Sequence, residues 1–270
     1  MKISHVIATA AATGVAVANA NAAAIKPLIV GGVEVPVGEK TWMVGLRDDI
    51  NLQSRCGGML ITPTKVLSAG HCPTFGYAAI GTHFKVNGTD GEQIKIVGEV
   101  RHPKYYEPDD NSVTWDYKII DLETPSQYEP VSILIEDPAV APFTGTFATA
   151  IGWGNTREEQ NGTHDSASNK LLRVDLQLRD LPTCAALGMT PLDETMVCAG
   201  GMEGEDTCNG DSGGPLFLET SQGDAIIGIV SWGNGCARKD QPGVYAKVHT
   251  VLDWIKEHAP ETKFVFYPDN

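Results

Sequence analysis

The sequence predicts an all-β protein, either a barrel or a sandwich, with one helix near its carboxyl end. Short apolar stretches alternate with clusters of Gly, Pro, Asn and Asp along most of the chain, as strands alternate with turns. Helical spacing is clear only near the end, where Val248, Val251, Leu252 and Ile255 fall at i, i+3, i+4 and i+7. We expect Thr250 to be the amino-terminal cap of this helix.

The clearest strand covers residues 172–179, where apolar and polar residues alternate strictly. Other apolar stretches predict strands over Lys65 to Ser68, Gln93 to Val100, Tyr117 to Leu122, Thr146 to Ile151 and Ala225 to Ser231. No repeat, low-complexity tract or linker interrupts residues 29–260. This length suits one large β domain or two similar β halves.

The amino-terminal segment indicates export from the cell. The first 24 residues carry one cation, Lys2, followed by an uncharged, Ala-rich run. Small residues at positions 18 and 20 form a signal peptidase pattern, and similar patterns end at residues 22 and 24. We expect a signal peptide over residues 1–20, with its end between 20 and 24, then a short propeptide over 21–28 and a secreted, extracellular protein. A membrane anchor is the weaker alternative, because no comparable apolar run follows.

The formal net charge of −14 bears on the choice of partners. An acidic surface repels nucleic acid and attracts cationic partners at low ionic strength, although it also serves solubility alone. We therefore expect no nucleic-acid partner and no membrane association, and we expect a monomer.

The six cysteines form an even set in a chain with an export signal, which predicts three disulfides. A zinc site is the competing interpretation, but no two cysteines have the close spacing of metal knuckles. We expect no metal and no other cofactor. The cysteines are Cys56, Cys72, Cys184, Cys198, Cys208 and Cys236.

A candidate nucleophile, Ser212, lies in the sequence GDSGGP at residues 210–215. Glycines around a serine permit a tight turn that exposes the hydroxyl, although an ordinary surface turn has the same composition. A serine needs a neighbouring base, and His71 is a candidate because small residues and Cys72 surround it. Asp116, flanked by aromatic residues, is the better candidate to orient that base, and Asp121 is its rival.

The ordered set of motifs resembles that of the secreted serine proteases of the trypsin and chymotrypsin family. This resemblance covers about residues 29–258 and implies two six-stranded antiparallel β-barrels, with the active site in the cleft between them and a C-terminal α-helix. Residues 29–260 would form the peptidase domain. The matching segments are residues 29–32 (IVGG), 56–58 (CGG), 69–72 (AGHC), 116, 152–154 (GWG), 210–215 (GDSGGP), 231–233 (SWG) and 242–245 (PGVY).

The resemblance assigns catalytic roles to three residues. It implies that Ser212 is the nucleophile, that His71 is general base and then general acid, and that Asp116 fixes the tautomer of His71. The backbone N–H groups of Gly210 and Ser212 would form the oxyanion hole.

The resemblance also implies a substrate preference. Asp206 stands where trypsin-like members carry the acid at the base of the primary pocket, and Gly233 and Gly243 stand at its walls, with Ser231 and Trp232 as further substrate-binding residues. A confined carboxylate needs a cationic partner, so cleavage after Arg or Lys is expected. The expected partners are protein or peptide substrates, an activating protease and protein inhibitors.

Activation and disulfide pairing follow from the same resemblance. Cleavage between Leu28 and Ile29 would free an amino group that pairs with Asp211. Because Leu28 is neither Arg nor Lys, we hypothesise that the enzyme does not activate itself efficiently and needs a protease of different specificity. The implied disulfides are Cys56 with Cys72, Cys184 with Cys198, and Cys208 with Cys236.

Other positions complete the sequence-based predictions. Asn87 and Asn161 begin N-glycosylation motifs. Thr82 and Thr89 replace two acids of the calcium loop of vertebrate trypsins and leave Glu92, so no tight calcium site is expected. The role of residues 261–270 is left open.

The alternative function is a catalytically weak or inactive binding or inhibitor protein on the same fold. The retained catalytic residues favour an enzyme over such a binder. A serine esterase of the α/β class is excluded, because it requires helices that alternate with the strands, and this sequence lacks them.

Overall fold

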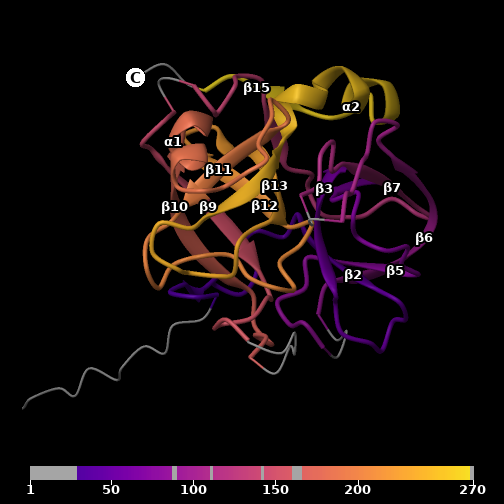
Figure 1. The fold of residues 1–270 in the computed structure, drawn as a ribbon. Helices are drawn as coiled ribbons and strands as arrows, with labels where there is room; N and C mark the ends of the chain where they lie inside the picture. Colours follow the sequence, from indigo (N-terminus) through magenta and orange to yellow (C-terminus); the bar gives the residue numbers. More distant parts are fainter. Residues whose placement is uncertain (1–28, 87–89, 110–111, 141–142, 160–165, 268–270) are drawn as a thin grey trace, which may run out of the picture.

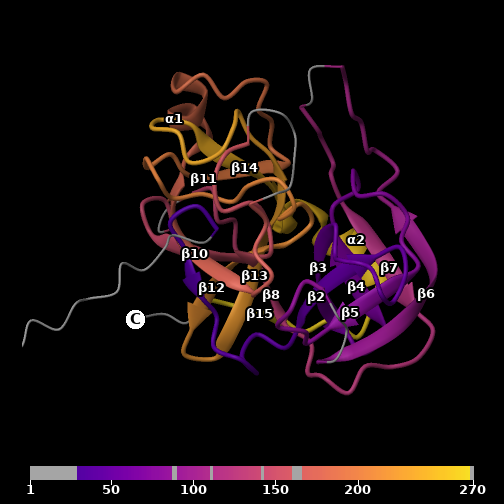
Figure 2. The same ribbon diagram turned by 90° about the horizontal axis from the view of Figure 1, so that it is seen from below.

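The computed structural model describes residues 29–86, 90–109, 112–140, 143–159 and 166–267. The expected signal peptide and propeptide, both glycosylation motifs and Thr89 lie outside these residues. Two lobes of strands lie side by side, the earlier part of the chain forming one and the later part the other (Figures 1 and 2).

The first lobe is a closed barrel of six antiparallel strands in the order β2-β3-β4-β7-β6-β5, with β5 paired to β2. Every residue of β3 is buried, so this strand lies in the interior of the molecule. The strands are β2 (Met43–Arg47), β3 (Cys56–Thr62), β4 (Lys65–Ser68), β5 (Tyr77–Ile80), β6 (Glu92–Arg101) and β7 (Lys118–Leu122).

The second lobe closes in the same way, through the ring β12-β9-β10-β11-β14-β13 and the pairing of β13 with β12. In β10 the buried residues alternate with more exposed ones, as its sequence predicts. The two-barrel fold expected from the resemblance is therefore confirmed. The ring strands are β9 (Phe147–Gly152), β10 (Leu172–Arg179), β11 (Met196–Gly200), β12 (Pro215–Thr220), β13 (Gly223–Trp232) and β14 (Pro242–Lys247).

Three short strands extend the second barrel. β1 (Val33–Glu34) pairs with β10, β8 (Ser132–Leu134) runs parallel to β13, and β15 (Phe264–Val265) runs parallel to β8. β15 gives residues 264–265 of the carboxyl-terminal extension a structural role. Tyr267 continues this attachment, because its ring meets Phe143 edge to face at a centroid distance of 5.1 Å.

The carboxyl-terminal helix begins differently from the prediction. A 3₁₀ turn, η1 (Val248–Val251), precedes α2 (Leu252–His258), and no side chain caps either of them. The prediction of Thr250 as the cap is wrong, because its hydroxyl donates to the carbonyl of Glu194 at 3.1 Å instead. Val248, Val251 and Ile255 belong to the same hydrophobic core as the buried residues of the first barrel. The carboxyl-terminal helix therefore packs against the lobe formed by the earlier part of the chain.

A second short helix, α1 (Leu181–Ala186), was not predicted from the sequence. Asp180 caps it by accepting a hydrogen bond from the N–H of Thr183 at 2.7 Å. In the described part of the chain, no helix is long and apolar enough to span a membrane.

Candidate active site

The pairing of β4 with β7 brings His71 and Asp116 together. These strands are antiparallel with Ser68 opposite Lys118, so the end of β4 lies beside the start of β7. His71 follows β4 and Asp116 precedes β7. The distance from His71 Nδ1 to Asp116 Oδ2 is 2.7 Å, and the backbone N–H of His71 donates to Asp116 Oδ1 at 2.8 Å.

Asp116 receives a third hydrogen bond from the second barrel, since Ser231 Oγ donates to its Oδ2 at 2.6 Å. Burial by itself would raise the pKa of Asp116, but the hydrogen bonds and charge of His71 and the Ser231 hydroxyl hold that pKa below its ordinary value. The pKa of His71 is raised above its ordinary value. Burial alone would lower it, but the hydrogen bond and the charge of Asp116 outweigh the effect of burial. The rival Asp121 lies apart from this pair and accepts from Lys65 Nζ.

The turn that carries Ser212 is fixed to the first barrel. The N–H of Gly57 in β3 donates to the carbonyl of Ser212 at 2.7 Å. The next residue, Gly213, has φ of 77°, and a Cβ there would lie 2.4 Å from Ser68 Oγ and 2.6 Å from the carbonyl oxygen of Gly57. Glycine is required at position 213 because the two barrels touch there.

His71 and Ser212 line one cavity of about 440 Å³ together with Gly210. Between described residues, no hydrogen bond joins Ser212 Oγ to His71, as is common before substrate tightens such contacts. The backbone N–H groups of Gly210 and Ser212 also donate to no other described group. Their donors are therefore available for a ligand.

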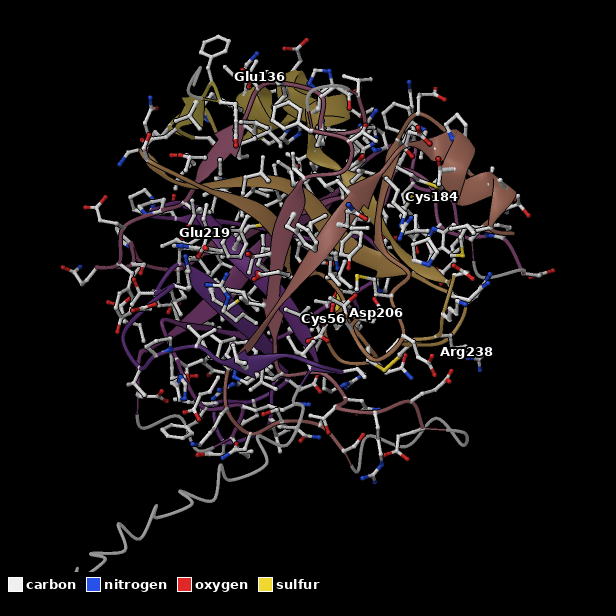
Figure 3. The ribbon with its side chains drawn as sticks, turned by 90° about the vertical axis from the view of Figure 1, so that its left-hand side faces the viewer. Cys56, Glu136, Cys184, Asp206, Glu219 and Arg238 are labelled. Carbon is white, nitrogen blue, oxygen red and sulfur yellow. A yellow bond between two sulfur atoms is a disulfide. The ribbon has the colours of Figure 1, made fainter. Side chains whose placement is uncertain are left out.

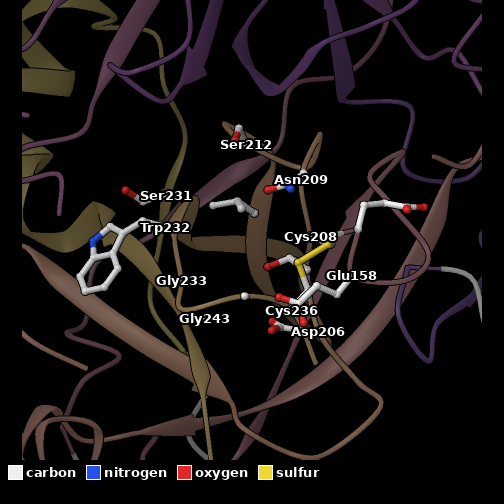
Figure 4. Close-up of a pocket in the computed structure, with 14 residues that line it drawn as sticks. Glu158, Asp206, Cys208, Asn209, Ser212, Ser231, Trp232, Gly233, Cys236 and Gly243 are labelled. Carbon is white, nitrogen blue, oxygen red and sulfur yellow. A yellow bond between two sulfur atoms is a disulfide. The ribbon is translucent and has the colours of Figure 1, made fainter. Parts of the chain in front are cut away.

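A second cavity, of about 120 Å³, contacts Ser212 on its other side and has Asp206 among its lining residues (Figure 4). Asp206 is 2% exposed. Its Oδ2 accepts from the N–H of Ala237 at 2.9 Å, whereas its Oδ1 has no partner among the described residues. Burial raises the pKa of Asp206 to about 7.

The other predicted substrate-binding residues line this cavity as well. Gly233 and Gly243 form part of its wall, and a Cβ on Gly243 would lie 3.3 Å from Asp206 Oδ1. Ser231 and Trp232 also line it, although the Ser231 hydroxyl is used by Asp116. Larger side chains at the two glycines would block the approach to the carboxylate.

Two acidic residues that the sequence did not single out, Glu158 and Glu159, complete the lining of the Asp206 cavity. Glu158 pairs with Arg238 at 2.9 Å. Arg238 lies at the edge of the molecule, while Asp206 lies well inside it (Figure 3). No sequence signal marks Glu158 or Glu159 as part of the site, because their segment reaches it only through the folding of the second barrel.

Asp211 is a third buried carboxylate beside the site. It accepts from the N–H groups of Gly154 at 2.7 Å and Cys208 at 2.9 Å, and burial raises its pKa to about 6. Ile29 is fully buried in the core of the second barrel, and its neighbour Val30 accepts from the N–H of Asp206 at 3.0 Å.

All three disulfides have the predicted pairing: Cys56 with Cys72, Cys184 with Cys198, and Cys208 with Cys236. The first adjoins His71 in the sequence, and both cysteines of the last line the Asp206 cavity. Covalent bonds thus brace both halves of the site.

Thr82 and Glu92, at positions that match the calcium loop of vertebrate trypsins, form hydrogen bonds within the protein. Thr82 Oγ1 donates to Asp90 Oδ1 at 2.7 Å, and Glu92 accepts from Ser126 Oγ at 2.6 Å. Among the described residues, no group of three or more His, Cys, Asp and Glu side chains gathers in a way that would hold a metal ion.

Residues 29–255 match the protein family described as Trypsin. The chain belongs to the trypsin family. Glucanase inhibitor protein 3 of Phytophthora infestans is 39% identical over 236 residues, which cover 84% of this chain and 87% of that protein. Glucanase inhibitor protein 4 of the same organism is 40% identical over 230 residues, covering 82% and 85%. Trypsin 5G1 of Aedes aegypti is 37% identical over 238 residues, covering 85% and 84%. This trypsin-family chain thus resembles both proteins named as inhibitors and a protein named as a trypsin.

Proposed function

We propose that this chain is a secreted serine endopeptidase that hydrolyses peptide bonds after Arg or Lys. The observation that carries the proposal is the convergence of a hydrogen-bonded His71–Asp116 pair and Ser212 on one cavity, next to a second cavity that contains the buried Asp206. The three disulfides suit an oxidising, extracellular compartment.

In the proposed reaction, Ser212 Oγ attacks the carbonyl carbon of the substrate while His71 Nε2 accepts the hydroxyl proton. Asp116 keeps the second ring proton on His71 Nδ1 and stabilises the imidazolium that forms. The N–H groups of Gly210 and Ser212 stabilise the oxyanion. His71 then protonates the leaving amine, and water releases the acyl group by the same route.

The preference for Arg or Lys rests on the unpaired oxygen of Asp206. An ionised carboxylate with so little exposure is costly unless a cation reaches it. The side chain of a bound Arg or Lys supplies that cation, and the glycine walls at Gly233 and Gly243 leave room for it.

We further propose that the chain is made as a zymogen, cleaved between Leu28 and Ile29. The new amino group would provide a partner for Asp211, which has only backbone N–H donors within hydrogen-bond distance among the described residues. Incubating the purified uncleaved chain alone and sequencing its amino terminus tests whether a second protease is needed. Prompt appearance of Ile29 as the first residue would contradict that requirement.

The test of the main proposal is hydrolysis of Arg, Lys and Phe peptide reporters by the cleaved chain, with Ser212→Ala as control. We expect hydrolysis of the Arg and Lys reporters only, and none by the control. Equal background rates for both proteins would contradict the proposed activity, and a preference for Phe would contradict the role of Asp206.

The second candidate function is binding and inhibition of a glucanase, with little or no proteolysis. Its support is the similarity to glucanase inhibitor proteins over more than four fifths of the chain. These relatives favour the second candidate, whereas the geometry of the site favours the first. Glucanase inhibition that survives in Ser212→Ala, together with absent peptide hydrolysis in the parent protein, would establish the second candidate and exclude the first.

A further inference from the structure

The two cavities that meet at Ser212 have linings of opposite charge. Among the described residues that line the smaller cavity, the ionisable side chains are the acids Asp206, Glu158 and Glu159, with no Lys or Arg. Glu158 pairs with Arg238 and Glu159 with Arg157, so Asp206 is the acid without a described cationic partner. The larger cavity is lined by Lys85 and Arg55 and by no acid. The described lining of the larger cavity is thus opposite in sign to the net charge of −14 that the whole chain carries.

The larger cavity lies on the leaving-group side of Ser212. If Asp206 holds the side chain before the scissile bond, the residues after that bond must run toward His71, because His71 protonates the leaving amine. His71 lines the larger cavity and not the smaller one. The residues that follow the scissile bond would therefore enter the cavity that contains Lys85.

Lys85 is held firmly in this cavity. Its carbonyl accepts from the N–H of Ser54 at 3.2 Å, and its own N–H donates to the carbonyl of Asn169 at 2.8 Å. Lys85 is only 4% exposed. Burial lowers the pKa of the Lys85 ammonium, whereas the charge of Asp211 opposes this shift.

The ammonium of Lys85 has donors to spare. It carries three N–H groups, and among the described residues only the carbonyl of Trp153 accepts one, at 3.2 Å. No ion pair within 4.0 Å joins it to Asp211, which acts on it only through its charge. A Cβ on Gly210 would lie 3.8 Å from Lys85 Nζ, so the ammonium lies against the proposed oxyanion hole.

We propose that Lys85 selects substrates with an acidic side chain, Asp or Glu, directly after the scissile bond. This inference rests on the proposed peptidase function and extends it from one side of the bond to both. The preferred sequence is then a cation followed by an acid, which matches the charges of the two cavities. Arg55 contributes less, because its exposed guanidinium already pairs with Asp48 at 2.7 Å.

The experiment uses a series of quenched fluorescent peptides with Arg before the scissile bond and Glu, Asp, Gln or Lys after it. Cleavage is measured with the activated chain, and binding of the same peptides is measured by fluorescence anisotropy with a Ser212→Ala chain that has been cleaved at the same bond. The variants are Lys85→Gln, which removes the charge, and Lys85→Arg, which keeps it. Lys170→Gln is the matched control, because Lys170 is an exposed lysine that pairs with Glu34.

We expect Glu to be preferred over Gln by roughly tenfold, in kcat/KM and in binding, as is usual for a hydrogen bond to a charged group. Lys85→Gln should abolish this ratio, and Lys85→Arg should retain most of it even if the uncharged variant folds poorly. Lys170→Gln should leave the ratio unchanged.

Two results would overturn the inference. One is equal treatment of Glu and Gln by the parent protein. The other is an equal loss for all peptides in Lys85→Gln, which would show that Lys85 acts through Asp211 instead. If no peptide is cleaved but the Ser212→Ala chain still binds Glu peptides more tightly in a Lys85-dependent way, the peptidase proposal fails and the charge selection stands.

Discussion

Asp116 and Asp206 are carboxylates with almost no exposed surface at one site, yet the protein treats them in opposite ways. Asp116, from the first barrel, accepts hydrogen bonds from the backbone and ring of His71 and from Ser231. Asp206, from the second barrel, has one described backbone donor and an unpaired oxygen. The pKa of Asp116 is lowered, while that of Asp206 is raised to about 7.

The difference shows which half of the site is complete within the folded chain. A buried charge is stable when hydrogen bonds and a cation surround it, and costly otherwise. Asp116 finds all its partners within the folded chain: His71 from the first barrel and Ser231 from the second. Asp206 and Asp211, from the second barrel, lack a cationic partner in the described structure. In the proposed mechanism, a substrate side chain pairs with Asp206 and the new amino terminus pairs with Asp211.

The largest expected effect comes from substituting Asp116, the carboxylate whose hydrogen-bond partners all lie within the chain. Asp116→Asn should lower kcat for the Arg reporter about ten-thousandfold, because the amide stabilises the wrong tautomer of His71. Asp121→Asn is the matched control, since this carboxylate pairs with Lys65 away from the site. Steady-state kinetics of both variants measure the effect, and a loss of less than tenfold in Asp116→Asn would remove Asp116 from the proposed mechanism.

Substituting Asp206, the carboxylate with an unpaired oxygen, should weaken substrate recognition but increase the stability of the folded protein. Asp206→Asn should lower kcat/KM for the Arg reporter on the order of a thousandfold, because the substrate cation loses its partner. It should also raise the free energy of unfolding by about 1–3 kcal/mol at pH 8, because a buried unpaired charge is removed. Glu203→Gln, at an exposed acid, is the control for both measurements. A destabilised Asp206→Asn protein with full activity would show that the two halves do not differ.

The pH dependence of stability sharpens the same comparison. The raised folded-state pKa values, about 7 for Asp206 and about 6 for Asp211 against 3.8 ordinarily, mean that the folded state binds protons more tightly than the unfolded state. Their contribution to stability is therefore complete below pH 3.8 and lost as the pH rises to about 7. For Asp206 alone the loss is at most roughly 4 kcal/mol. Denaturant unfolding of the parent protein and Asp206→Asn between pH 4 and 8 should show two similar free energies of unfolding at pH 4 and a difference in favour of Asp206→Asn that grows as the pH rises through about 7. Parallel curves would contradict this expectation.

Local sequence patterns predicted the all-β class and individual strands because they carry their own physical signal. The alternation at residues 172–179 reproduces the bounds of β10, since a half-buried strand requires that pattern. The two-barrel architecture, the three disulfide pairs and the cavity position of Asp206 were implied by the resemblance to the trypsin family, not by local patterns.

Features that depend on distant contacts could not be predicted. Thr250 looks like a helix cap, but a nearby carbonyl takes its hydroxyl. Trp115 has φ of 53°, a conformation that its bulk does not favour, and it is stacked on His102 at 4.8 Å. Lys85 and Glu158 reach the site through the packing of segments far from it in sequence. The helix α1 is too short to show periodicity, although Asp180 before Pro182 was a usable signal.

The smallest effect is expected at Ser231, because its hydrogen bond is only one of three that Asp116 accepts. Ser231→Ala removes the hydroxyl that donates to Asp116 Oδ2, but both hydrogen bonds from His71 remain. We expect kcat to fall by only about three- to tenfold, or about 0.7–1.4 kcal/mol, the net worth of an ordinary hydrogen bond, because the two bonds from His71 still hold the carboxylate. The pH profile separates this role from a purely structural one. Without the hydroxyl, the carboxylate exerts a stronger negative potential on His71, so the raised pKa of His71 should rise further and the acidic limb of kcat/KM should move to higher pH. An unchanged limb would mean that Ser231 only packs against Asp116, and a loss as large as that of Asp116→Asn would mean that the carboxylate has no redundancy.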